Sequence, residues 1–560
     1  MIELIIAHAM AALLSPVLVR FFKRGAYWLL ALVPAATAGW AALQTQAVLA
    51  GEFPTQTYRW VPELGLEISF RMDVLSWLMT LIVGGVGTLI LIYCSGYFSK
   101  GAANMGRFAG CFVAFAGAML GLVTTDNTML LYLFWELTTV FSFLLIGHYH
   151  ERQASRRAAM QAITVTTLGG LCMLVGLVML GVAPAGSFTI SELISNATTG
   201  LLVDSAPQHY TSAAAALLLV GAFTKSAQIP THFWLPAAMA APTPVSGYLH
   251  SSAMVKAGIY LVARFTPGFG DLTIWHWSII FFGLGTMVFG GWQSLKQFDL
   301  KLLLAYGTVS QLGFIMVLVG FGSQAVMLAG MTMLLGHALF KATLFLTVGA
   351  IDHEFNTRDL RQLSNVWQAT PGLMILATIA AASMAGLPPL LGFVGKEGAL
   401  AALYDEPDTG RMVFVVIIVG SIITMAYTLR FWWGAFAPKP RVADSPKHRV
   451  DWRLLAPICV LTVASVAFGF MSHALESAFT PYAQTLPGEP GHLALWAGFT
   501  PALWATVIVI VAGIGLFNSV GRRMDNVGGQ TNFISAEDAY RAVINTLNDV
   551  ASDVTAFVQR

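Results

Sequence analysis

Long apolar stretches constrain the fold of this chain more than any other feature of its sequence. Blocks of roughly 20 mostly apolar residues, the length that crosses the hydrocarbon core of a bilayer, recur from residue 1 to about residue 520. Charged residues make up only 10% of the chain and apolar residues 56%, a composition unlike that of a soluble domain. We therefore predict an all-α polytopic membrane protein with about fifteen transmembrane helices.

Charge and cysteine content argue against several classes of function. The formal net charge is only +2 and the basic residues lie in short loops, which argues against a nucleic-acid partner. The cysteines, Cys94, Cys111, Cys172 and Cys459, lack metal-ligand spacing and are interpreted as packing residues. We recognise no nucleotide loop, flavin site, haem ligand pair or iron-sulfur motif, so we assign neither a cofactor nor a metal.

Lys and Arg gather in alternate loops, which predicts an orientation because cytoplasmic loops are enriched in positive charge. Basic loops lie at residues 23–24, 100–107, 152–157, 296–301, 358–361, 439–453 and 522–523. The connections at 184–210 and 476–490 contain no Lys or Arg. We therefore expect the N-terminus outside the cell membrane and the C-terminus in the cytoplasm. The first apolar block has no basic start, so we expect it to be retained as a span.

The last residues of the chain depart from this apolar pattern. Apolar side chains recur there at helical spacing among polar residues. They are Tyr540, Val543, Leu547, Val550, Val554 and Val558. We predict an amphipathic helix that lies along the membrane or on a partner, with a frayed solvated tail as the alternative.

Two apolar blocks are interrupted by helix breakers beside a charge: KSAQIP at 225–230, and GLPP at 386–389 followed by Lys396 and Glu397. Proline frees backbone groups, and membrane helices tolerate this where protein or a water-filled cavity satisfies them. Broken helices in two halves of a chain are typical of transporters built from inverted repeats. Ordinary proline kinks would give the same pattern.

Ionisable residues deep within apolar blocks are the main functional signal, because each costs about 2.5 to 3.5 kcal/mol on insertion scales. They are Glu136, Lys225, His232, His250, Lys256, Lys301, His337, Lys341 and Lys396. A buried Glu/Lys pair can take up or release a proton as it separates, and a row of Lys and His can pass protons along. We therefore predict proton translocation. The alternatives are that these charges only fix helix packing, and that Lys301 is a cytoplasmic anchor.

Several motifs carry a resemblance to a known family. FTKSAQIPTHFWLP at 223–236 and APTPVSGYLHSSAMVKAGIY at 241–260 resemble the signature of proton-pumping antiporter subunits. That family includes the membrane-arm subunits of respiratory complex I and the large subunits of Mrp-type multisubunit Na+/H+ antiporters. Further similar motifs are DLKLLLAY at 299–306, HALFKA at 337–342, MAGLPP at 384–389 and GKE at 395–397. His232, Lys256 and IDHE at 351–354 are typical of the large A subunit of the Mrp type.

The resemblance implies two inverted repeats of about five helices, each with a broken helix. The corresponding ranges are 108–267 and 268–433, flanked by N-terminal helices at 1–107, C-terminal helices at 434–525 and the amphipathic helix at 526–560. It also implies roles for site residues: Glu136 pairs with Lys225 in the first half-channel, His250 links toward Lys301, and Lys341 and Lys396 belong to the second half-channel.

As function, the resemblance implies secondary antiport of Na+ and H+ by a hetero-oligomer in a bacterial cell membrane, rather than an enzyme. The alternative is a proton-pumping subunit of complex I or a related hydrogenase, in which electron transfer elsewhere drives the same path. The A subunit of this family is usually longer, so we expect a truncated form, a fragment or a split gene product. Candidate Na+ ligands are Asp73, Thr124, Asp126, Thr138 and Thr139, although short polar residues at helix ends are more often caps.

Overall fold

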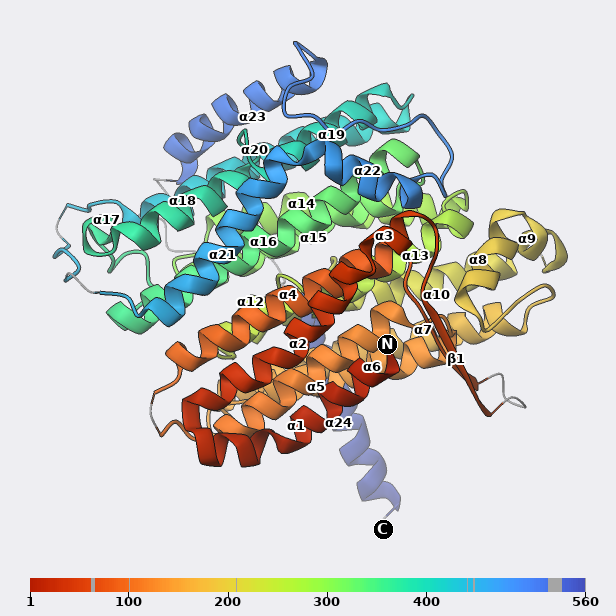
Figure 1. The fold of residues 1–560 in the computed structure, drawn as a ribbon, viewed down its shortest axis with the longest axis horizontal. Coiled ribbons are helices and arrows are strands. Elements are labelled where there is room, and N and C mark those ends of the chain that lie inside the picture. The colour runs from red at the N-terminus through yellow and green to blue at the C-terminus, as the bar shows by residue number, and fades with distance from the viewer. Residues whose placement is uncertain are drawn as a thin grey trace.

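The computed structural model describes residues 1–61, 66–99, 101–207, 209–440, 442–446, 449–521 and 536–558. The chain is mostly helical, at 78%, and its long helices run side by side in one bundle (Figure 1). The predicted mostly helical membrane architecture is therefore confirmed at this level.

The helices and strands follow one another in three stretches of the chain. The first comprises α1 (Ile2–Phe22), α2 (Ala26–Leu43), α3 (Thr45–Leu49), β1 (Thr55–Val61), β2 (Leu66–Arg71), α4 (Val74–Tyr97), α5 (Met105–Thr124), α6 (Thr128–Ile146) and α7 (Gln153–Val182). The second comprises α8 (Ile190–Thr198), α9 (Leu201–Ser205), α10 (Tyr210–Lys225), η3 (Thr231–Phe233), α11 (Trp234–Ala237), η4 (Ala238–Ala240), α12 (Thr243–Leu249), α13 (Met254–Phe269), α14 (Thr273–Leu295), α15 (Leu300–Gly320) and α16 (Gln324–Phe355). The third comprises α17 (Val366–Ala369), α18 (Pro371–Ala385), α19 (Leu391–Asp405), α20 (Thr409–Phe436), α21 (Trp452–Phe470), α22 (Ser472–Ala483), α23 (Pro501–Leu516), η5 (Phe517–Gly521) and α24 (Ala536–Val558).

By length and composition, eleven helical stretches of the described residues are able to cross a membrane. The first of these, Ile2–Leu43, joins α1 and α2 across a short 3-10 turn, and the apolar helices α10 and α18 are shorter than a full span. The multi-pass prediction is confirmed, whereas the predicted count of about fifteen spans is not.

A β hairpin corrects the all-α prediction. Strands β1 and β2 pair antiparallel, with Thr55 opposite Arg71 and Tyr58 opposite Ile68. The amino group of Met1 donates a hydrogen bond to the Gln56 side chain at 2.8 Å, which ties α1 to this hairpin. The sequences TQTYRWV and LEISFR are rich in β-branched and aromatic residues, so a strand signal was present.

Helix α16 lies at the centre of the bundle. Its most apolar stretch is wholly buried, and it packs against α4, α12, α15, α18, α19 and α21. These neighbours shield it from the surrounding lipid. Its own His337 and Lys341 are fully buried as a result.

Both predicted helix interruptions are present. Helix α10 ends at Lys225 and the chain resumes as η3, and α18 ends at Ala385 before α19 begins. A third interruption, at residues 250–253 between α12 and α13, was not predicted because this segment was expected to be one span. There the Ser251 hydroxyl donates to the Gly247 carbonyl and lies 2.6 Å from the Ser252 hydroxyl. Such side-chain bonds compete with the backbone bonds of a helix.

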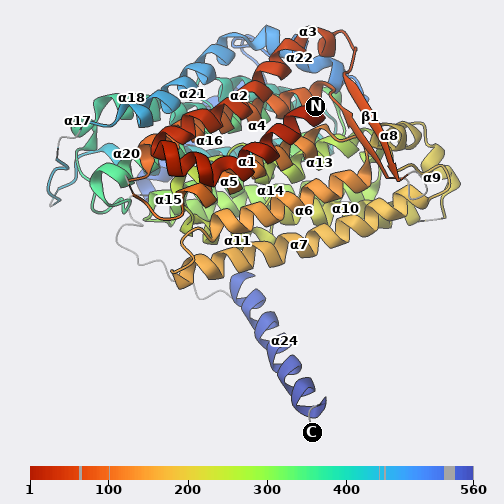
Figure 2. The same ribbon diagram turned by 60° about the horizontal axis from the view of Figure 1, so that its bottom comes forward.

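The predicted tail helix is present as α24, which projects from the bundle (Figure 2). The Tyr540 ring packs 5.3 Å from the Phe233 ring of η3, centre to centre, so the helix begins against the first interruption. Several predicted features lie outside the described residues. They are the side chains of Val543, Leu547 and Val558, and the basic residues Lys100, Arg522 and Arg523.

Helices α2 and α4 approach each other closely at Gly84, and a substitution there tests this contact. A Cβ atom at Gly84 would lie 2.8 Å from the Ala38 nitrogen and the Pro34 carbonyl oxygen, whereas at Gly85 it would meet nothing within 4 Å. We expect Gly84→Ala to destabilise the protein by about 1 to 3 kcal/mol, because the helices must move apart. Thermal unfolding of the detergent-solubilised protein measures this against Gly85→Ala, and equal melting temperatures would contradict the α2–α4 contact.

Candidate functional site

Lys225, at the end of α10, points at the middle of α6. Its ammonium group donates to the Trp135 carbonyl at 2.9 Å and to the Thr139 hydroxyl at 2.7 Å, and it lies 4.8 Å from the centre of the Trp135 ring. The side chain is fully buried. Two oxygens and an aromatic face therefore replace the water that this cation lacks.

Glu136 is the neighbour of Trp135 on α6 and interacts electrostatically with Lys225. Within the described part of the chain these two side chains form no ion pair within 4.0 Å, and the Glu136 Oε1 atom has no hydrogen-bond partner. Its carboxylate lies against Gly170 of α7, where a Cβ atom would come within 2.2 Å of Oε1. The predicted pair is thus brought together as neighbours, with Lys225 bound to oxygens of α6 and the Glu136 carboxylate against α7.

Lys256, His337 and Lys341 form a second buried group where α13, α15 and α16 meet. The Lys256 ammonium donates to the Leu334 carbonyl at 2.6 Å, and the Lys341 ammonium donates to the Leu304 carbonyl at 3.3 Å. His337 lies between them and interacts electrostatically with both lysines. Neither nitrogen of its ring has a hydrogen-bond partner among the described residues.

Lys301, in the first turn of α15, borders a polar cavity of about 430 Å³. Its ammonium donates to the Met239 carbonyl at 2.9 Å and to the Ala241 carbonyl at 2.5 Å. Other charged residues around the cavity are Arg152, Asp352 and Arg358. His250, at the end of α12, interacts electrostatically with Lys301. This buried lysine therefore stands between a polar cavity and the interior of the bundle.

His232 and Lys396 lie apart from these groups. His232 is in η3, with its ring centre 4.8 Å from that of Phe289. Lys396 folds back over the second interruption, where its ammonium donates to the Ala385 carbonyl at 2.8 Å. Within the described residues, neither side chain makes a hydrogen bond or ion pair with another predicted site residue.

The candidate Na+ ligands have other roles in the structure. Asp73 caps α4 by accepting a hydrogen bond from the Ser76 nitrogen at 3.0 Å, and Asp126 accepts from the Ser191 nitrogen at 2.9 Å and hydroxyl at 2.7 Å. Thr124 and Thr138 donate to carbonyls of their own helices. Asp73 thus caps its own helix, as the alternative interpretation expected, and Asp126 binds the first turn of α8. Among the described residues, no group of three or more His, Cys, Asp or Glu side chains is arranged to hold a metal ion.

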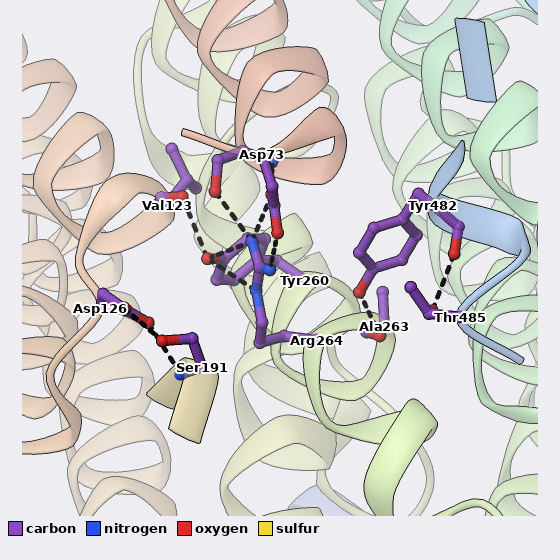
Figure 3. A network of polar contacts seen from close by, with 10 residues as sticks. Asp73, Val123, Asp126, Ser191, Tyr260, Ala263, Arg264, Tyr482 and Thr485 are labelled. Carbon is purple, nitrogen blue, oxygen red and sulfur yellow. Dashed lines mark hydrogen bonds and ion pairs between the residues drawn. The ribbon is translucent and has the colours of Figure 1, made fainter. Parts of the chain in front are cut away.

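The structure adds participants that the sequence pattern did not single out. Trp135 solvates Lys225, and the Tyr427 ring lies 5.9 Å from the Lys341 ammonium. These uncharged partners carry no signal in a search for buried charges. Arg264 does carry that signal, because it is ionisable and lies in the apolar helix α13, and it forms an ion pair with Asp73 (Figure 3).

Two family models match the chain. One, described as NADH:quinone oxidoreductase/Mrp antiporter, TM, matches residues 125–424. The other, described as NADH-Ubiquinone oxidoreductase (complex I), chain 5 N-terminus, matches residues 60–109. The chain is 36% identical over 532 residues to the Na(+)/H(+) antiporter subunit A1 of Staphylococcus aureus, covering 90% of this chain and 65% of that protein. It therefore spans slightly less than two thirds of the length of this curated relative.

Two solved structures resemble the fold. A chain of the Mrp complex from Dietzia sp. DQ12-45-1b matches with a TM-score of 0.86 and 35% identity, covering 98% of this chain and 60% of that chain. A chain of the membrane-bound sulfane sulfur reductase, an archaeal respiratory membrane complex, matches with a TM-score of 0.74 and 20% identity, covering 87% of this chain and 99% of that chain. The second likeness shows the fold alone.

The position of the Glu136 carboxylate against α7 is open to a double-mutant test. We expect Gly170→Ala to cost about 1 to 3 kcal/mol of stability, because the added methyl group displaces that carboxylate. In a Glu136→Ala background the same change should cost little, since the colliding atom is gone. Thermal unfolding of the single and double variants measures the difference. An equal cost in both backgrounds would place the carboxylate elsewhere.

Proposed function

Since the chain belongs to the family of transmembrane subunits shared by NADH:quinone oxidoreductases and Mrp antiporters, we propose that it acts as the large A subunit of a multisubunit antiporter. This antiporter exchanges external H+ for cytoplasmic Na+. The observation that carries the proposal is the set of lysines and histidines buried inside a bundle that folds like a chain of the Mrp complex. Such intramembrane residues are the usual sign of an ion path.

The proposed proton path runs through the buried groups described above. Glu136 and Lys225 serve the first half-channel, and Lys341 and Lys396 the second. His250 links toward Lys301, which meets the polar cavity, while Lys256 and His337 join the two halves. His232 belongs to the same set and stands in the first interruption. Lysine and histidine side chains are suited to this task because both change protonation state readily in response to neighbouring charges.

We assign the two half-channels to inverted repeats at 108–267 and 268–433, within about fifteen spans. The flanking parts are the N-terminal helices at 1–107, the C-terminal helices at 434–525 and the tail helix at 526–560. Support comes from the two interruptions, which leave Lys225 at the end of α10 and Lys396 one turn into α19. Counting α1 and α2 separately and adding the short apolar helices α10 and α18 raises the total above the eleven long stretches.

Partner subunits complete the proposed antiporter. The relative from Staphylococcus aureus is named as a subunit, and the similar Dietzia chain belongs to a complex. We therefore place this chain in a hetero-oligomer with other antiporter subunits. The proposal covers the part of those relatives that this chain spans.

A proton pump driven by electron transfer is the second candidate, because the matching family model also covers NADH:quinone oxidoreductases. The 36% identity to a Na(+)/H(+) antiporter subunit over 90% of the chain favours the antiporter. His232 and Lys256, which are typical of the A subunit, point the same way. An antiporter works without an electron donor, and this difference separates the two candidates.

We place the N-terminus outside and the C-terminus in the cytoplasm of a bacterial cell membrane. Burial, together with the nearby charges of Arg107 and His150, lowers the pKa of His148, in the loop between α6 and α7, to about 4. This histidine is therefore neutral at pH 7, and positive charge at that end comes from arginines such as Arg107 and Arg152. Enrichment in arginine and lysine is the mark of a cytoplasmic loop.

This orientation predicts which engineered cysteines react from outside. We expect Glu489→Cys, in a connection without Lys or Arg, to react with a membrane-impermeant maleimide on intact cells. Arg361→Cys should react only after the cells are permeabilised. Both native side chains are exposed, so access to the correct side is the only barrier. The reverse pattern of reaction would invert the topology.

Exchange measured in inverted vesicles tests the function. The vesicles come from an antiporter-deficient host that expresses the complete set of subunits, and Na+ drives proton movement without any electron donor. We expect Glu136→Gln and Lys225→Met to lower exchange at least about tenfold at equal abundance of the complex, because each removes a proton-carrying group.

Lys296→Met is the matched control, since Lys296 lies at the end of α14 against the Trp292 ring and outside the proposed path. Normal exchange by the Glu136 and Lys225 variants would remove these residues from the path. Failed assembly of both variants would favour a purely structural role for the buried charges. Wild-type vesicles that move protons only with an electron donor would favour the second candidate.

A further inference from the structure

A cavity of about 380 Å³ lies at the end of the bundle that carries the β hairpin. Its wall includes residues of the connections at 184–210 and 476–490, which contain no Lys or Arg and which we place outside the cell. Ser191, Ser195, Thr198 and Thr199 are among its lining residues. In the orientation proposed above, this cavity lies on the outer side, opposite to the cavity at Lys301.

An ion pair between Arg264 and Asp73 (Figure 3) forms part of the wall of this outer cavity. The Arg264 guanidinium binds both oxygens of the Asp73 carboxylate, with Nη2 2.9 Å from Oδ1 and Nη1 in contact with Oδ2. Nη2 also donates to the Ser76 hydroxyl at 2.8 Å. The side chains are 13% and 14% exposed, so one edge of the pair meets the cavity and the rest is buried. Bidentate pairs of this kind are among the stronger polar contacts in proteins.

Tyr260 stands directly behind the ion pair. Its hydroxyl accepts a hydrogen bond from Arg264 Nε at 3.3 Å and donates one to the Val123 carbonyl at 3.0 Å. This tyrosine is 1% exposed. The guanidinium and the tyrosine hydroxyl are thus the polar groups that follow one another from the cavity into the bundle.

One face of α13 connects this outer network to the buried lysines. Lys256, Tyr260 and Arg264 are spaced four residues apart and therefore share a helix face. At 1.5 Å per residue, about 12 Å of helix separates Lys256 from Arg264. Lys256 in turn donates to the Leu334 carbonyl, one turn before His337. The same face thus joins the outer cavity to the centre of the proposed proton path.

The Arg264 guanidinium keeps its proton at any physiological pH and occupies both oxygens of the Asp73 carboxylate, so the intact pair takes up no proton from the cavity. Asp73 holds the guanidinium there, and the other titratable groups that face Asp73 are Arg71, Tyr260 and Tyr482. We propose that the Arg264–Asp73 ion pair is the outer gate of the proton path, which opens toward Lys256 when the pair separates. This inference rests on the proposed function.

Removal of the guanidinium tests the gate in vesicles that contain the complete complex. We expect Arg264→Gln to dissipate an imposed pH gradient about threefold faster than wild type in the absence of Na+, because glutamine cannot form the ion pair that keeps the Asp73 carboxylate from taking up a proton. A residue that only stabilises the fold would lower the abundance of the complex without creating this Na+-independent leak. Arg453→Gln is the control. It removes an arginine that forms an ion pair with Asp451 at 3.2 Å, and this pair is not on α13.

A second measurement leaves the ion pair intact. Ser195→Cys places a thiol in the outer cavity, and an impermeant cationic thiol reagent applied to intact cells before the vesicles are prepared should slow exchange at least about twofold by adding positive charge above the gate. The same reagent on wild type controls for the native cysteines. The Ser195→Cys experiment still tests the gate if the Arg264→Gln complex fails to assemble.

The outcomes separate the gate from the proposed function. The gate is wrong if assembled Arg264→Gln shows a normal decay of the pH gradient, or if modification of Ser195→Cys leaves exchange unchanged. In either case, Na+-driven exchange by the wild type would still support the antiporter. If wild-type vesicles show no Na+-driven exchange, the proposed antiporter function is wrong, and the gate proposal that rests on it is wrong as well. A leak in Arg264→Gln together with inhibition through Ser195→Cys supports the gate.

Discussion

Every buried lysine of the candidate site is held by a backbone carbonyl, and this interaction links the broken helices to the chemistry. The donors are Lys225, Lys256, Lys301, Lys341 and Lys396, and the acceptors are the carbonyls of Trp135, Leu334, Met239 with Ala241, Leu304 and Ala385. An ammonium group far from water needs such oxygens, because leaving it unsolvated in a low-dielectric interior costs a great deal of free energy. The Met239, Ala241 and Ala385 carbonyls lie at helix ends or interruptions, where carbonyls lack a partner in their own helix. The Trp135, Leu334 and Leu304 carbonyls lie inside α6, α16 and α15.

The helix arrangement follows from the need to surround these groups completely. Helix α16 carries His337 and Lys341 and is surrounded by other helices, so that neither of these side chains is exposed. Glycines permit the close approach. Gly386, at a positive φ of 82°, leaves room for the Lys396 side chain, whose Nζ would lie 3.0 Å from a Cβ at that position. Any larger residue there would displace the lysine or strain the turn.

The two ends of the bundle differ in how they meet this buried interior. One end presents Lys301 to a polar cavity, with Arg152, Asp352 and Arg358 around it. The other end places the Arg264–Asp73 ion pair between its cavity and the interior. Both ends therefore present a cation at the boundary between water and the bundle. Of Lys301 and Arg264, the two cations at these boundaries, Arg264 is the one that keeps its proton at any physiological pH.

The sequence alone determined the membrane fold, the buried charges and two of the three helix interruptions, because bilayer thickness and the cost of burying charge act on local stretches of chain. It did not predict the interruption at 250–253, which depends on serine hydroxyl bonds, nor the ion pair of Asp73 with Arg264. Those features were decided by tertiary structure. Lys225 and Thr139 are 86 residues apart, and Arg264 and Asp73 are 191 apart. A buried charge must find its partner on another helix, and which helix lies there is set only when the whole bundle packs.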